Sequence, residues 1–300
     1  MKLTHGRAVW LMVGVTLMWS TAGVVTRHLE GARSFEVTFW RSAFTALALL
    51  VILPTWQGRA VFSTVRRGGR ALWISGICWS VMFTAFMVAL TLTSIANVLV
   101  TMAVGPLLTA LAARLFIGHR LPVRTWTAIA AAGLGIGWMY GTQLGSGQWL
   151  GTVVALCVPI AGAANWTVVQ HANAQGRRID LVPAVLIGAV LSAFATLPLA
   201  WPLSASTGDL ALLAFLGLFQ LSIPCVLSLQ CARVLTAPEV ALLALLEVIF
   251  GIALAWVGAG EVPTASVLGG GLLVIGALVA NELLAVRERH AGAGRSLRSP

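Results

Sequence analysis

The chain has 300 residues, of which 59% are hydrophobic and only 9% are charged, and its formal net charge is +10. Soluble domains carry about 25% charged residues, so this composition excludes an ordinary water-soluble protein and indicates that lipid is part of the solvent. The positive charge does not indicate nucleic-acid binding, because the basic residues are spread over many short loops and form no basic domain.

Apolar runs of about the length that crosses a bilayer as a helix follow one another along the chain. A backbone in lipid must satisfy its own hydrogen bonds, and runs of ~20 residues without alternation do not suit a barrel. The sequence therefore predicts an all-α polytopic membrane protein with ten transmembrane helices. The ten runs are 8–27, 35–54, 71–91, 95–117, 123–141, 149–170, 181–201, 209–230, 237–257 and 264–286.

The first run resembles a secretory signal, because Lys2 and Arg7 precede it and Ser20 begins a small-residue segment after its core. Its apolar character continues through Val25, so we expect a retained span. With the N-terminus in the cytoplasm, fifteen Lys and Arg residues fall in inside segments and two in outside loops. This bias predicts an even number of crossings with both termini cytoplasmic.

One segment of the chain is repeated. Ser94 to Pro122 and Thr236 to Pro263 share a small-residue opening, and a period of 141 or 142 residues relates them. Each copy runs into a Gly-rich apolar segment, Thr127–Gly141 or Ser266–Ala280. A period near half the chain length indicates duplication, and an odd-numbered unit repeated in tandem enters the membrane from the opposite side.

The fold class predicted is therefore two inverted five-helix repeats. Residues 1–145 form the first repeat, residues 146–290 the second, and residues 291–300 a disordered cytoplasmic tail. Inverted repeats are the architecture of many secondary transporters, whose substrate site lies near the bilayer midplane where the halves meet. The Gly-rich fifth and tenth spans have small faces that let helices approach closely, so we expect them to serve as scaffold or self-association surfaces.

The chain resembles the EamA-like domain, which is duplicated in the ten-helix drug/metabolite transporter superfamily. The resemblance rests on Pro106 in the first half and on Gly260-Glu261, Gly269 and Gly276 in the second; Trp19 and Arg41 also fall where that family often has these residue types. The chain departs from the family pattern at His119, where Glu is usual, and at Val248, where Pro is usual. The resemblance implies an inner-membrane exporter of amino acids or similar solutes, closest to the branch that exports aromatic amino acids and paraquat-like compounds.

Ionisable residues inside spans are functional hypotheses, because charge is costly in lipid. Glu247 lies near the middle of the ninth span, either as a cation- or proton-binding carboxylate or as a protonated side chain that bonds to a neighbouring helix. Arg41 and Arg114 lie closer to span ends, so we expect snorkelling or a structural ion pair, with Glu36 a partner for Arg41.

Polar and aromatic side chains form stripes on several spans, and such faces turn inward, away from lipid. They line a cavity or bond helix to helix, and their spacing does not decide between these roles. Aromatic rings beside Asn and Thr suit an amphipathic solute with an apolar or cationic part. Together with Glu247, the substrate-binding residues predicted are Trp19, Ser20, Trp79, Phe83, Asn97, Thr101, Asn165 and Trp166.

Other classes of protein lack their signatures here. No phosphate-cradling G-x-x-x-x-G-K-[ST] loop occurs, the five histidines are dispersed, and the four cysteines lie in apolar runs without metal spacing. We therefore expect no enzyme activity, no cofactor and no metal, although a channel-like pore and an intramembrane enzyme stay as alternatives. The predicted partners are a small-molecule solute and the bilayer, with no nucleic acid, in a monomer or homodimer.

Overall fold

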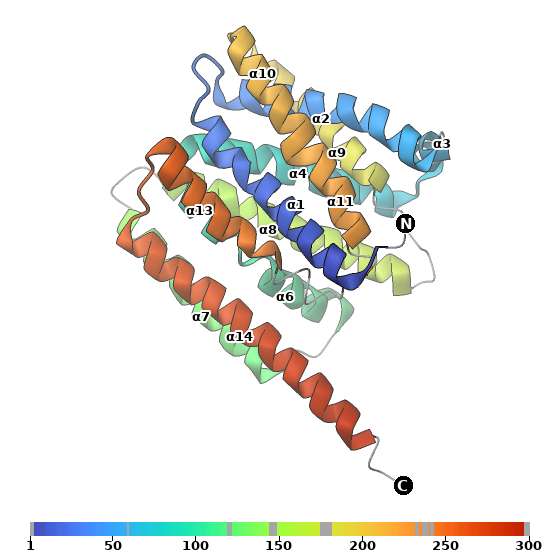
Figure 1. Ribbon diagram of the computed structural model, residues 1–300, viewed down its shortest axis with the longest axis vertical. Helices are drawn as coiled ribbons and strands as arrows, with labels where there is room; N and C mark the ends of the chain where they lie inside the picture. Colours follow the sequence, from blue (N-terminus) through green and yellow to red (C-terminus); the bar gives the residue numbers. More distant parts are fainter. Residues whose placement is uncertain are drawn as a thin grey trace.

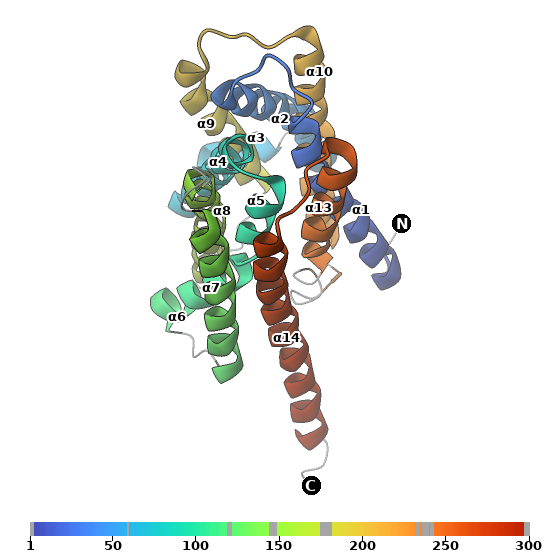
Figure 2. The ribbon, with the colours of Figure 1, turned by 90° about the vertical axis from the view of Figure 1, so that its left-hand side faces the viewer.

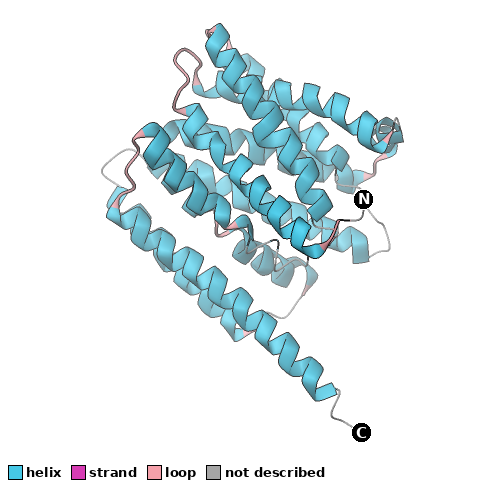
Figure 3. Ribbon diagram, viewed as in Figure 1, coloured by secondary structure: helices cyan, strands magenta, loops and turns pink. Residues whose placement is uncertain are grey.

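The computed structural model describes residues 3–58, 60–118, 122–143, 149–174, 182–231, 234–235, 240 and 243–296. Within these ranges the chain is helical, with short connections and no strand (Figure 3). Seven of the described helical stretches are long and apolar enough to cross a membrane, and two shorter apolar helices follow them. The chain is thus a multi-pass membrane protein.

The helices follow the predicted runs closely (Figure 1). The first half contains α1 (His5–Thr26), α2 (Ser34–Gln57), α3 (Ala60–Arg67), α4 (Arg70–Leu92), α5 (Ile95–Met102), α6 (Gly105–Ile117) and α7 (Val123–Gln143). The second half contains α8 (Trp149–Ala174), α9 (Val182–Ala200), α10 (Thr207–Phe215), the π-helix η1 (Leu216–Ser222), α11 (Ile223–Cys231), α13 (Leu246–Ala259) and α14 (Ala265–Ser296).

Two parts of the helical structure differ from the expectation. The short helix α3, which joins α2 to α4, was not predicted, because its eight residues carry too little apolar character to stand out as a span. The helix α14 continues to Ser296, so the described part of the predicted tail 291–300 is helical. The first residues of the ninth predicted run lie largely outside the described residues.

The two copies of the repeated segment share local backbone features. The helix breaks after α5, and Val104 (φ −71°, ψ −7°) precedes α6; Leu245 (φ −63°, ψ −21°) precedes α13 in the same way. The helices α6 and α13 both end at a glycine in the left-handed region, Gly118 (φ 74°) and Gly260 (φ 66°). Glycine adopts this conformation without the steric cost of a Cβ, which explains why both copies end on it.

Helices from the two halves intermix in the packing. The helix α1 packs on α13 and α11, while α8 packs on α6 and α4. The helix α2 packs on α9 and η1, and α9 also packs on α4. Several of these approaches need glycine: a Cβ on Gly188 would lie 2.4 Å from the Trp79 Cβ, and one on Gly76 would lie 2.4 Å from Ile187 Cγ2. Neither half therefore forms a separate domain.

The helices α7 and α14 lie side by side as a pair along one flank of the bundle (Figures 1 and 2). Their closest approach is at Gly135 and Gly270, where a Cβ on Gly135 would lie 2.7 Å from the Gly270 carbonyl oxygen. The stripe of Gly133, Gly137 and Gly141 does not make this contact, because a Cβ at any of the three would meet nothing within 4 Å. Small residues thus join the two Gly-rich helices, but through a different face.

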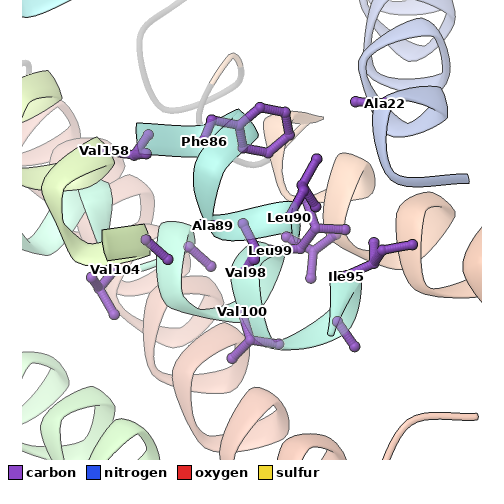
Figure 4. Close-up of a cluster of buried hydrophobic side chains, with 14 of the residues drawn as sticks. Ala22, Phe86, Ala89, Leu90, Ile95, Val98, Leu99, Val100, Val104 and Val158 are labelled. Carbon is purple, nitrogen blue, oxygen red and sulfur yellow. The ribbon is translucent and has the colours of Figure 1, made fainter. Parts of the chain in front are cut away.

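The largest described cluster of buried hydrophobic side chains centres on α4 and α5 and extends to α7, α8, α13 and α14. Figure 4 shows Leu90 of α4 close to Leu99 of α5, with Ile95 on one side and Phe86 and Val158 towards the other. These side chains fix the α4–α5 corner. This corner belongs to one end of the bundle, called here the α1–α2 end and defined by residues 27–33, 93–94, 201–206 and 260–264.

Candidate functional site

The guanidinium group of Arg41 is the centre of the candidate site. Arg41 lies on α2 and is only 2% exposed. Its Nε and Nη2 atoms both donate to the Oε1 atom of Gln220, at 3.1 and 2.7 Å. Its Nη1 atom is buried and has no hydrogen-bond partner among the described residues. A cation thus sits inside the helix bundle with one edge of its donor fork unused.

Gln220 reaches Arg41 because it lies on the π-helix η1, a wider turn that is frequent at functional sites. The Gly217 carbonyl oxygen on this helix accepts from Ser222 Oγ at 2.7 Å and from Thr45 Oγ1 at 3.3 Å. The Gln220 Nε2 atom donates to the Trp19 carbonyl oxygen at 3.2 Å. One amide therefore connects α1, α2 and η1.

Aromatic rings cover the guanidinium. The Arg41 Cζ atom lies 5.9 Å from the centre of the Phe83 ring and 5.7 Å from that of Phe86, within the range of cation–π attraction. Trp79 packs against Phe83 with ring centres 5.5 Å apart. The Nε1 atom of Trp79 is a second buried donor with no hydrogen-bond partner among the described residues. The α4 face of the site is thus apolar with an unsatisfied N–H group.

Glu247 supplies a carboxylate in the first turn of α13, directly after the helix break at Leu245. It interacts electrostatically with Arg41 and with Cys225. Both Trp19 and Glu247 keep accessible surface, whereas Arg41 does not. The break in the ninth span therefore places an acidic side chain near the buried cation.

The structure brings together four of the predicted site residues, namely Trp19, Trp79, Phe83 and Glu247, around Arg41 and Gln220. Sequence reasoning did not assign Gln220 to the site. The expectation for Arg41 was wrong, because its side chain is buried among helices of both halves and does not snorkel. Arg114, by contrast, is exposed on α6.

The other predicted site residues make contacts between or within helices. Asn97 bonds to Thr93 at 2.9 Å and to Thr152 of α8, and Thr101 donates to the Asn97 carbonyl oxygen. Asn165 of α8 bonds to Ser75 of α4, and Ser20 donates to the carbonyl of Leu17. Trp166 is 49% exposed. Buried polar pairs of this kind join helices in a membrane, which is one of the two roles left open by their spacing.

Carboxylates join loops at the α1–α2 end. Asp209 accepts hydrogen bonds from the backbone N–H groups of Glu30, Gly31, Ala32 and Ser206, at 2.9 to 3.1 Å. The structure corrects the pairing proposed for Glu36, whose carboxylate accepts from Ser204 and Ala205 and not from Arg41. These two acids are committed to backbone groups, so they serve the loops and not the Arg41 site.

A second cluster at the same end joins α1, α5 and Glu261, which follows the C-cap of α13. The Glu261 carboxylate accepts from the Ile95 N–H at 3.2 Å and pairs with Arg27 at 3.3 Å. Arg27 also donates to the carbonyl oxygens of Leu90 and Thr93. Glu261 thereby connects the ends of two helices to the start of a third. His119, its counterpart in the first copy, lies outside the described residues.

Metal binding finds no support in the described part of the chain, where no group of three or more His, Cys, Asp or Glu side chains is placed to hold an ion. The cysteines there are free thiols.

Residues 6–141 match the model of the EamA-like transporter family. The matched residues extend from α1 to α7, and this part of the chain is similar to membrane solute transporters. A solved structure described only as "Crystal structure of protein" has the same fold over 94% of this chain and 99% of its own, with a TM-score of 0.63 and 20% identity. None of the curated proteins matches the chain.

Proposed function

We propose that the protein is a secondary transporter of the bacterial inner membrane that exports small organic solutes, with amino acids (aromatic or other neutral) as the first class and cationic drugs as the second. The observation that carries the proposal is the Arg41–Gln220 contact, in which a buried cation from the first half is held by an amide from the second. Transporters built from repeats bind their substrates where the repeats meet.

The packing of the helices supports two inverted five-helix repeats. Two related repeats would pair α1 with α8, α2 with α9, α4 with the α10–η1–α11 span, α5–α6 with α13, and α7 with α14. Under this correspondence the contact of α1 with α13 has its counterpart in the contact of α8 with α6, and that of α4 with α8 in that of α11 with α1. The contacts of α2 with α9 and of α7 with α14 each join two corresponding helices. The left-handed glycines that end α6 and α13 obey the same correspondence. Ten spans in this relation suit alternating access about a central cavity.

Sidedness supports a cytoplasmic location of both termini. Two basic residues, Arg27 and Arg33, are predicted in outside loops. Both lie at the α1–α2 end of the bundle. Arg27 is bound there to Glu261 and to two backbone carbonyl oxygens, so it serves the structure. Under this orientation the α1–α2 end faces the periplasm.

Two other functions stay in competition. A channel-like pore would conduct without saturation, and an intramembrane enzyme would form a product without net flux. Neither explains why a buried cation is held between the two halves. The family match is to transporters, which favours a carrier.

Counterflow in proteoliposomes tests the proposal. Vesicles that contain the purified protein and are preloaded with unlabelled amino acid should accumulate labelled amino acid transiently, and the initial rate should saturate. A rate that rises linearly with concentration and shows no counterflow would refute a carrier. Reporter fusions should place residues 142–148 and 202–208 outside the cytoplasm, and a cytoplasmic signal from either would refute the topology.

A further inference from the structure

We propose that Arg41 binds the carboxylate of the exported solute through its unused Nη1 edge, so that the protein selects carboxylate-bearing zwitterions over organic cations. This inference rests on the proposed function, because it names the solute class of the same site. It separates the two solute classes that the proposed function leaves side by side.

The first step concerns the donors that remain on Arg41. A guanidinium group has five N–H donors in a planar fork. Gln220 Oε1 takes the edge formed by Nε and Nη2, so the end-on edge formed by Nη1 and the second hydrogen of Nη2 is left. The Nη1 atom is buried and has no partner among the described residues. That edge matches the two oxygens of a carboxylate, which Arg binds in bidentate geometry.

The second step concerns the cost of leaving this edge empty. Burial of an unpaired donor is unfavourable, and charged donors cost most, because protein or lipid groups replace the water that they lose. Natural structures keep such groups where a ligand or water completes them. The Trp79 Nε1 atom is a second donor of this kind, and Trp79 and Arg41 both contact Phe83. Two unsatisfied donors beside the same ring indicate a polar group of the solute at this place.

The third step concerns the charge that the solute carries. Glu247 interacts electrostatically with Arg41, and when it is ionised its carboxylate opposes a second negative charge on the ligand. A dianion such as phosphate is therefore disfavoured, whereas the ammonium group of an amino acid is attracted. An organic cation without a carboxylate would meet the positive charge of Arg41 and leave its edge empty. The pair thus favours a solute with both charges.

The fourth step concerns the rest of the solute. Phe83, Phe86 and Trp79 form an apolar aromatic surface beside the guanidinium. The side chain of an apolar or aromatic amino acid can bury its surface against these rings. Trp19 and Glu247 are partly exposed and Arg41 is buried, so we place the entry of the solute on their side.

Three compounds that differ by one charged group test the inference. They are L-phenylalanine, phenethylamine, which lacks the carboxylate, and 3-phenylpropanoate, which lacks the ammonium group. Binding to the purified full-length protein in detergent and flux in proteoliposomes are measured for each. Phenylalanine should bind at least about tenfold more tightly than phenethylamine, because the amine leaves a buried charged donor unpaired. The acid 3-phenylpropanoate should retain more of the affinity than the amine.

A matched pair of substitutions assigns the effect to Arg41. Arg41→Lys keeps the charge and removes the planar fork, so it should weaken phenylalanine binding at least about tenfold and leave phenethylamine unchanged. Arg114→Lys makes the same change at an exposed position on α6 and should leave both unchanged. Size-exclusion profiles show which variants fold. If Arg41→Lys does not fold, the three compounds on the wild-type protein still test carboxylate recognition.

The outcomes separate this inference from the proposed function. Equal affinity for phenylalanine and phenethylamine, or failure of both phenylalanine and 3-phenylpropanoate to bind at millimolar concentration, would overturn carboxylate recognition. Displacement of phenylalanine by equimolar inorganic phosphate would also overturn it, because the site would then accept any anion. Carboxylate-dependent binding without flux or counterflow in vesicles would support this inference and refute the transporter.

Discussion

Asp209→Asn should destabilise the protein strongly, although it changes only one oxygen to an amide nitrogen. The Asp209 carboxylate receives four backbone N–H groups, one on Oδ1 and three on Oδ2. It is only 2% exposed, so water does not replace a lost bond. Three of these donors, at Glu30, Gly31 and Ala32, belong to the loop between α1 and α2. The substitution therefore acts on the joint between this loop and α10.

The size of the effect follows from the count of donors. An asparagine oxygen can take the place of Oδ2 and keep three bonds, but its amide nitrogen then faces the Glu30 N–H group, donor against donor. One unpaired buried donor costs about 1–3 kcal/mol, and the remaining bonds lose their charge assistance. The sum is about 3–5 kcal/mol, which corresponds to a fall in Tm of roughly 10 °C for a chain of this size.

Intrinsic tryptophan fluorescence of the detergent-solubilised protein during heating measures this change, and Glu30→Gln is its matched control. Glu30 lies in the same loop with an exposed side chain, so its substitution removes the same charge and leaves the backbone bond intact. We expect this control to stay within about 0.5 kcal/mol of the wild type. If Asp209→Asn melts together with Glu30→Gln, the carboxylate is not what joins the loop to α10.

Three further predictions address transport, the α1–α2 end and helix packing. Glu247→Gln should lower counterflow at least about tenfold or abolish its pH dependence, because the amide neither carries charge nor exchanges a proton; wild-type flux at every pH would assign Glu247 a structural role. Glu261→Gln removes an ion pair and a carboxylate at the start of α5, which together contribute about 1 kcal/mol. A Thr26→Cys reporter should therefore react with an impermeant maleimide about fivefold faster. An unchanged rate would show that this cluster does not limit access to position 26. Gly188→Leu should abolish folding, since its Cβ would lie 2.4 Å from the Trp79 Cβ, whereas Gly133→Ala meets open space and should be neutral in the same melting assay.

Hydropathy located the helices because each span must cross the same thickness of hydrocarbon, which fixes a minimum apolar length. The helix α3 was not predicted, because it is short and does not cross the membrane. Neither helix break was predicted, because hydropathy gave 95–117 and 237–257 as unbroken runs. Gly105-Pro106 is compatible with the break after α5, since proline favours the first turn of a helix. The break before α13 has no proline.

The site was harder to predict than the helices. Glu247 stood out because a carboxylate within a span is rare. Arg41 did not, because its distance from the end of its own helix was short, and its burial depends on helices that are remote in sequence. Its partner Gln220 is 179 positions away and lies on a π-helix, whose wider turn shifts side chains away from the 3.6-residue period. Periodicity within one span cannot reveal such a contact.

Burial alone does not distinguish the charged residues that serve the fold from the one that can bind a solute. Glu36, Arg41 and Asp209 are all almost fully buried. Both carboxylates spend their oxygens on backbone N–H groups of loops at the α1–α2 end, so a ligand would have to displace bonds that hold the chain together. Arg41 alone of these three keeps an edge without a partner. A binding site needs hydrogen-bonding groups without a partner, and for this reason we place the solute beside Arg41 in the bundle and not at the α1–α2 end.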